Sequence, residues 1–106
     1  MRNVQAEAII IKNGGTLVIS LLGDIDHHSA KRLRGEIDSA LFLNRPKRAT
    51  IDLSGVEFMD SSGLGLILGR LSRVSELGGK LTLQAPSQQV QRVLALAGVE
   101  RLLEIK

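Results

Sequence analysis

Apolar residues alternate along this chain between short strand-like runs and helix-like spacing, with no linker or low-complexity segment between them. Two β-branched runs, at 8–11 and 17–22, flank the Lys-Asn-Gly-Gly segment at 12–15, whose composition is typical of a hairpin turn. Short apolar runs follow at 49–53 and 81–83. The pattern therefore predicts an antiparallel pair of strands followed by separate buried strands.

Two helix-like segments have both a start and a stop signal. Asp26 is expected to be the N-cap of the first, which ends at the Asn-Arg-Pro sequence at 44–46. The second is expected to run from 61 to about 77, where Gly78 and Gly79 stop it. The residues expected to form its core face are Leu64, Ile67, Leu68, Leu71 and Val74.

A third helix is expected to have Pro86 near its first position, where the missing backbone donor does no harm. Gly98 ends this helix, and residues 102–105 form a last strand or an extended tail. The residues expected to face inward are Val90, Val93, Leu94 and Ala97.

Strands separated by helix-length crossovers predict an α/β fold. We expect a mixed, mostly parallel sheet of four to five strands, with an antiparallel N-terminal strand and about three main helices. Because 106 residues suit one compact unit, residues 1–106 are expected to form a single domain.

The residue composition argues against several classes of site and location. The chain has no cysteine, and its two histidines, His27 and His28, are adjacent, so a shared metal site is not expected. No apolar run approaches the roughly 20 residues that span a bilayer, and the N-terminus lacks a signal-peptide pattern. The protein is therefore expected to be cytoplasmic, without membrane contact.

The net charge of +3 does not by itself indicate nucleic-acid binding. The two aromatic residues, Phe42 and Phe58, lie far from any basic run, so stacking on bases is not expected. Lys31, Arg32 and Arg34 are expected to form a solvated helix face instead. No direct nucleic-acid partner is predicted.

The stretch from Phe58 to Arg70 places two serines at the start of a helix. Asp60 is expected to cap that helix, with Ser61 and Ser62 in its first turn. A helix N-terminus has free amide donors and partial positive charge, so a phosphate is tolerated there. Ser61 is therefore the leading candidate for a functional residue.

Glycines follow these serines at Gly63, Gly65 and Gly69. Their spacing matches neither the dinucleotide fingerprint nor the P-loop. Gly65 and Gly69 lie on one helix face, and each costs about 1 kcal/mol relative to alanine. Close packing is the favoured explanation for these two glycines, with close approach of a partner as the alternative.

Two enzymatic interpretations are weaker than the structural ones. A serine nucleophile is not supported, because Met59 stands where the G-x-S-x-G motif needs glycine. Asp24, Asp26 and Asp60 could hold magnesium for phosphoryl transfer, but Asp26 and Asp60 are better explained as helix caps. A small nucleotide-binding or phosphoryl-handling enzyme remains one alternative, and a scaffold of a signalling complex is another.

Two segments resemble the bacterial anti-sigma factor antagonists, which are single STAS domains of the sporulation type. The first is Gly-Asp-Ile-Asp-His-His-Ser-Ala at 23–30, and the second is Val-Glu-Phe-Met-Asp-Ser-Ser-Gly-Leu-Gly at 56–65. The Asp-Ser-Ser-Gly-Leu-Gly motif is specific, and the similarity extends through the glycines at 78–79 and the segment at 94–98.

The resemblance implies a non-enzymatic switch without cofactor, metal or catalytic residue. In the implied mechanism, the unphosphorylated protein binds an ATP- or ADP-bound anti-sigma factor that is also a serine kinase, which frees a sigma factor. Phosphorylation of Ser61 ends the binding, and a serine phosphatase restores it. The implied partner-binding residues are Asp24, Asp26, His27, Asp60, Ser61, Ser62, Gly63 and Gly65.

Overall fold

The computed structural model describes residues 6–106 and contains a five-stranded sheet, three α-helices and one short 3-10 helix. In chain order the elements are β1 (Glu7–Asn13), β2 (Thr16–Leu22), α1 (His27–Asn44), β3 (Arg48–Gly55), α2 (Ser61–Glu76), β4 (Lys80–Gln84), α3 (Gln88–Leu96), η1 (Val99–Arg101) and β5 (Glu104–Ile105). None of the helices in this described part is long and apolar enough to cross a membrane.

The strands lie in the order β1-β2-β3-β4-β5. β1 pairs with β2 in the antiparallel direction, and the other neighbouring pairs are parallel, which confirms the predicted mixed sheet. Gly14 in the β1–β2 turn has a φ of 64°, a conformation that glycine adopts without steric cost. The last strand is shorter than the predicted 102–105, because Leu102 closes η1 before β5 begins.

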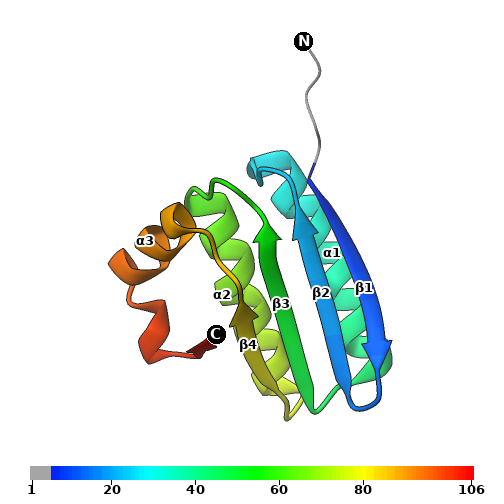
Figure 1. Cartoon of the computed structure of the whole chain (residues 1–106). Coiled ribbons are helices and arrows are strands. Elements are labelled where there is room, and N and C mark those ends of the chain that lie inside the picture. Colours follow the sequence, from blue (N-terminus) through cyan, green and yellow to red (C-terminus); the bar gives the residue numbers. More distant parts are fainter. Residues whose placement is uncertain (1–5) are drawn as a thin grey trace.

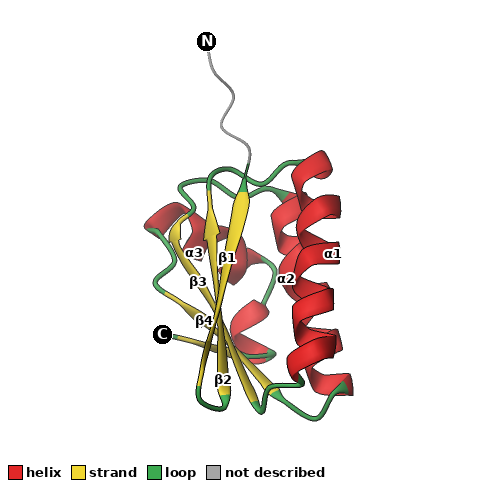
Figure 2. Cartoon of the chain, turned by 90° about the vertical axis from the view of Figure 1, so that its right-hand side faces the viewer, coloured by secondary structure: helices red, strands yellow, loops and turns green. Residues whose placement is uncertain are grey.

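α1 and α2 pack side by side on one face of the sheet (Figures 1 and 2). The strand residues beneath them are buried: Leu17, Ile19, Leu21, Ala49, Ile51, Leu53, Leu81 and Leu83. The opposite face is more open, since Ile9 and Ile11 of β1 are 48% and 57% exposed. Each buried leucine or isoleucine contributes about 1.5–3 kcal/mol, so the layer between sheet and helices dominates the stability.

α2 ends at the predicted glycines in a Schellman motif. Gly78 has a φ of 81°, and its N–H donates to the Ser75 carbonyl at 3.0 Å. The Gly79 N–H donates to the Val74 carbonyl at 2.9 Å, which completes the motif. A Cβ at Gly79 would lie 2.5 Å from the Pro46 carbonyl oxygen, so this position also needs glycine for packing.

α3 corrects two predictions. Ser87 is its N-cap and accepts a hydrogen bond from a backbone N–H at 3.1 Å, so Pro86 is buried before the cap and not at the first helical position. Val90 and Leu94 face inward as predicted, but Ala97 is exposed. The inward face is lost there because Ala97 is already the C-cap, where the chain leaves the helix.

The interface between α1 and α2 contains a buried charge that the apolar pattern did not predict. Arg70 is 4% exposed, and its Nε lies 2.9 Å from Asp38 Oδ1 of α1. The angles do not make a hydrogen bond, so the contact is ionic, and Arg70 Nη1 has no hydrogen-bond partner within residues 6–106. Burial lowers the pKa of Arg70, Asp38 raises it, and the nearby Arg73 and Arg34 lower it further. Gly63 and Leu66 are the other buried residues of α2 that the predicted core face omits.

Candidate functional site

The candidate site lies where β2 and β3 end and lead into the N-termini of α1 and α2. The two connecting loops run side by side, because Ile25 and Met59 form an isolated parallel bridge. The Gly23 N–H also donates to the Gly55 carbonyl at 2.9 Å. Since Asp26 and the serine motif follow this bridge directly, the structure brings the two predicted segments together at one end of the sheet (Figure 1).

Asp26 is the N-cap of α1, as predicted. Its Oδ1 accepts a hydrogen bond from the Ser29 N–H at 2.8 Å, and the Asp26 N–H donates to Ser29 Oγ at 2.9 Å. These reciprocal bonds form a capping box. The Ser29 N–H and the Ser29 hydroxyl, whose Oγ donates to Asp26 Oδ1 at 3.0 Å, hold the pKa of Asp26 below its ordinary value. Ser29 was not among the predicted site residues, although the Asp-x-x-Ser spacing resembles a capping-box signal.

Asp60 caps α2, also as predicted. Its Oδ1 accepts hydrogen bonds from the backbone N–H groups of Ser62 at 2.8 Å and Gly63 at 3.3 Å. The Asp60 carboxylate is therefore fixed beside the first turn of α2.

Ser61 is the first residue of α2 and is exposed, whereas Ser62 is partly buried. Neither hydroxyl makes a hydrogen bond to another residue between positions 6 and 106. The free, exposed hydroxyl of Ser61 is available to a second molecule. Chemically, it can act as a phosphoryl acceptor.

The structure gives the glycines of the motif different surroundings, and these decide whether close packing explains each one. A Cβ at Gly63 would lie 2.7 Å from Met59 Cγ, so Gly63 is required for α2 to pack on its own preceding loop. A Cβ at Gly65 or Gly69 would meet nothing within 4 Å. The packing explanation is therefore wrong for Gly65 and Gly69, because the neighbouring elements leave space above both.

The loops around Ser61 are acidic. Asp24, Asp26, Glu57 and Asp60 are all exposed, and the segments 23–30 and 56–63 contain no lysine or arginine. His27 and His28 begin α1 beside these carboxylates, and their ring centroids are 6.2 Å apart. No three potential metal-ligating side chains come together in the part of the chain that is described. The electrostatic character of this end suits a cationic partner.

Phe58 is the site residue that sequence reasoning did not assign. It is 47% exposed in the loop before Asp60. The β4–α3 connection also reaches this loop, because Ser87 Oγ donates to the Glu57 carbonyl at 3.3 Å. The only sequence signal for this role is that Phe58 is an aromatic residue next to the serine motif. Because aromatic residues are more often buried in a core, that signal did not reveal its exposure.

Residues 7–106 match the model of the STAS domain family, and the chain belongs to that family. It is 37% identical over 84 residues to an anti-sigma F factor antagonist of Lysinibacillus sphaericus, which covers 79% of this chain and 72% of the relative. It is 30% identical over 94 residues to an anti-sigma-B factor antagonist of Bacillus subtilis (strain 168), covering 89% of this chain and 84% of the relative.

Solved structures show the same fold. The unphosphorylated form of the anti-sigma factor antagonist SpoIIAA aligns with a TM-score of 0.81 and 30% identity, covering 94% of this chain and 88% of that one. The phosphorylated form of the Bacillus cell fate determinant SpoIIAA aligns with a TM-score of 0.74 and 29% identity, covering 94% of this chain and 91% of that one. The predicted family and fold are confirmed, and the relatives are regulatory proteins.

Proposed function

We propose that this protein is an anti-sigma factor antagonist regulated by phosphorylation. Its unphosphorylated form binds an anti-sigma factor that is also a serine kinase, and a sigma factor is thereby released. Phosphorylation of Ser61 ends the binding, and a serine phosphatase reverses it. The observation that carries this proposal is the exposed Ser61 hydroxyl at the start of α2, beside the loop that ends in Asp26.

The contact surface in this proposal consists of the two loops and the first turns of α1 and α2. Asp24, Asp26 and His27 contribute from the first loop, and Asp60, Ser61, Ser62 and Gly65 from the second. Gly63 belongs to the same turn, although it is buried against Met59. The open space above Gly65 allows a partner to approach the α2 backbone closely. Names of the relatives support the antagonist function.

Phosphate on Ser61 acts mainly on the partner and not on the fold. The amides and dipole at the start of α2 favour the phosphate by about 0.3–2 kcal/mol. Asp60 opposes it, with a like-charge repulsion of about 1 kcal/mol for each unit charge at 4 Å in water. Because these terms nearly cancel, the larger effect is the desolvation of a dianion against the partner, which costs several kcal/mol unless it is paired.

The test is incubation with ATP and the anti-sigma factor serine kinase encoded in the same genome. Intact mass should show one added phosphate, and peptide mapping should place it on Ser61. Ser61→Ala should abolish the modification, whereas the matched control Ser62→Ala should accept phosphate. A phosphate on Ser62, or equal modification of Ser61→Ala, would show that the site is wrongly assigned.

A binding measurement tests the second half of the proposal. The unphosphorylated protein should bind the ADP-bound kinase, and the phosphorylated protein should bind it at least about tenfold more weakly, which corresponds to 1.4 kcal/mol. Equal affinity of the two forms would contradict the switch.

A further inference from the structure

The end of the sheet opposite Ser61 carries a cluster of cations. Lys12, Arg45, Lys47, Arg48 and Lys80 lie on the β1–β2 hairpin, on the loop after α1 and at the starts of β3 and β4. Register places Arg48 opposite Lys80 and Lys12 opposite Leu17 at the same end of the sheet. Since successive side chains of a strand alternate between faces, Lys12 is on the face covered by the helices, and Arg48 and Lys80 are on the other face. None of the five forms an ion pair with Asp or Glu in the chain from residue 6 onward.

A cavity of about 310 Å³ is lined by three of these cations, Lys12, Arg45 and Lys47. The hairpin forms one wall with Lys12, Gly14 and Gly15, and the loop after α1 forms the other with Arg45 and Lys47. No carboxylate lines it. Its volume is at the lower end of the range for small-molecule sites, which are about 300–1,000 Å³.

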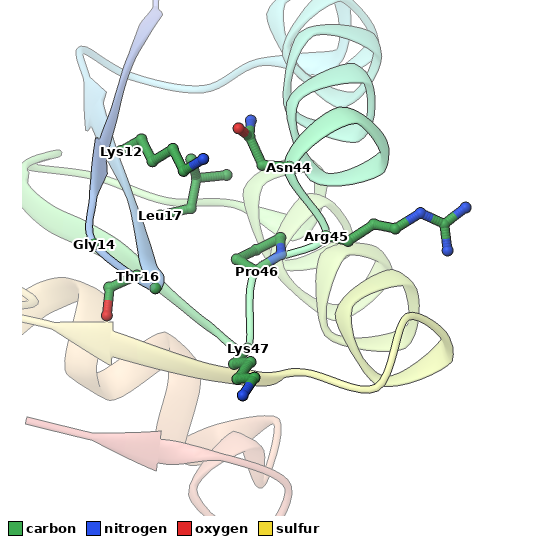
Figure 3. A pocket seen from close by; sticks show the side chains of 9 residues that line it. Lys12, Gly14, Thr16, Leu17, Asn44, Arg45, Pro46 and Lys47 are labelled. Atoms are coloured by element: carbon green, nitrogen blue, oxygen red, sulfur yellow. The ribbon is translucent and has the colours of Figure 1, made fainter.

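Lys12 is directed toward this space. It shares a sheet face with the buried Leu17, so it points to the side covered by the helices, and Figure 3 shows its side chain reaching toward Asn44. The Asn44 amide nitrogen already donates to the Ala40 carbonyl at 2.8 Å. A lysine on this side also discourages pairing of the β1 edge with another strand, but that role does not explain the second lysine, Lys47, at the same cavity.

Arg45 contributes differently from the two lysines. Its guanidinium lies 4.9 Å from the centre of the Phe42 ring, and Figure 3 shows the side chain turned away from the cavity. Lys12 is therefore the cation that reaches into the cavity, as Figure 3 shows. The Lys47 ammonium is directed away from Lys12 in Figure 3, but Lys47 also lines the cavity, and its exposed side chain, which forms no ion pair within the described residues, is free to turn toward a ligand. A lysine ammonium is a compact point charge that suits phosphate oxygens.

We propose that this cavity binds a phosphate group of a small anion or of a lipid headgroup, with Lys12 and Lys47 as its charged contacts. The site is separate from the Ser61 surface and independent of the function proposed above. Open space beyond Gly14 and Gly15 leaves room for the rest of the ligand, because a Cβ at either glycine would meet nothing within 4 Å.

Two probes distinguish the sources of the phosphate. Tripolyphosphate is titrated into the full chain and followed by backbone amide shifts, and vesicles of phosphatidylglycerol are compared with neutral phosphatidylcholine vesicles by co-sedimentation. Saturable shifts confined to 12–16 and 44–48 indicate a free anion, whereas binding only to phosphatidylglycerol vesicles indicates a headgroup. Whichever probe binds, its affinity should be about tenfold lower for the double variant Lys12→Gln/Lys47→Gln.

A matched double variant controls for overall charge. Lys31→Gln/Arg92→Gln removes two exposed cations from α1 and α3 and should leave binding of the same probe unchanged. Equal weakening by both double variants would show a nonspecific charge effect and overturn the proposal. Absence of binding to both probes at millimolar concentration, with folded protein by amide spectrum, would overturn it as well.

Discussion

Asp26 has two roles that a single substitution can separate. It caps α1 through its hydrogen bond with the Ser29 N–H, and in the proposed function its negative charge faces the partner. Asp26→Ser keeps a side-chain oxygen that serves as an N-cap nearly as well. We expect a folded protein with little change in unfolding midpoint, but about tenfold weaker kinase binding by calorimetry. Undiminished affinity would leave Asp26 with the structural role alone.

The capping box also predicts a dependence of stability on pH. The bonds from Ser29 lower the pKa of Asp26 below the unfolded value of about 3.9. The ionised carboxylate is therefore more favourable in the folded state than in the unfolded state. Its contribution is fully present above about pH 4 and is lost as the pH falls through the folded pKa. Urea unfolding should be measured at neutral and at acidic pH. The free energy of unfolding should fall less on acidification for Asp26→Asn than for the protein with Asp26. An identical loss in both would contradict the contribution of this cap.

Gly63 and Gly65 offer a matched test of the two explanations for glycine in the motif. Gly65→Ala should raise the free energy of unfolding by about 1 kcal/mol, because the position is helical and open. Gly63→Ala should lower it by about 1 kcal/mol, since the new methyl overpacks against Met59. Denaturant unfolding measures both. A stabilised Gly63→Ala, or a destabilised Gly65→Ala, would reverse the assignment.

At the level of elements, α1 and α2 are joined by the ionic contact between Asp38 and Arg70. Asp38→Ala leaves the buried Arg70 guanidinium without its carboxylate and should lower the free energy of unfolding by about 3 kcal/mol. This value is at the lower end of the range for a buried ion pair that loses one partner, because Asp38 is 25% exposed. Arg70→Met replaces the buried charge with an apolar chain of similar length and should cost less. Urea unfolding of both variants compares them, and a larger loss for Arg70→Met would contradict this account.

The sequence predicted those features that depend on neighbouring residues. Asp26, Asp60 and Gly78 act on backbone groups within a few positions, so their roles as caps and stop signals were readable from local spacing. Arg70 was not readable as buried, because its place depends on Asp38 of another helix. The prediction that Ala97 faces inward was wrong for a related reason, because helical periodicity does not reveal where a helix ends.

The candidate site was predictable only in part. Both segments were found from their motifs, and strand order explained why they meet. The space above Gly65 and the exposure of Phe58 depend on how the loops pack, which no residue spacing encodes.

For the whole molecule, we expect phosphorylation of Ser61 to leave the fold intact. The unphosphorylated and phosphorylated SpoIIAA structures both share this fold. Thermal midpoints of the two forms should differ by less than about 10 °C. Amide exchange should change only in segments 24–29 and 60–65. Widespread loss of protection would show that the switch is conformational instead.

The separation of charge along the sheet makes the molecule an electric dipole, with carboxylates around Ser61 and five cations at the far end. In the field of a cationic partner, the molecule turns its acidic loops forward during approach, although its net charge is +3. In the proposed switch, a phosphate on Ser61 adds negative charge at the acidic end and so strengthens this dipole. On that proposal, we expect the phosphorylated molecule to be oriented toward the partner in the encounter but not to be retained in the complex.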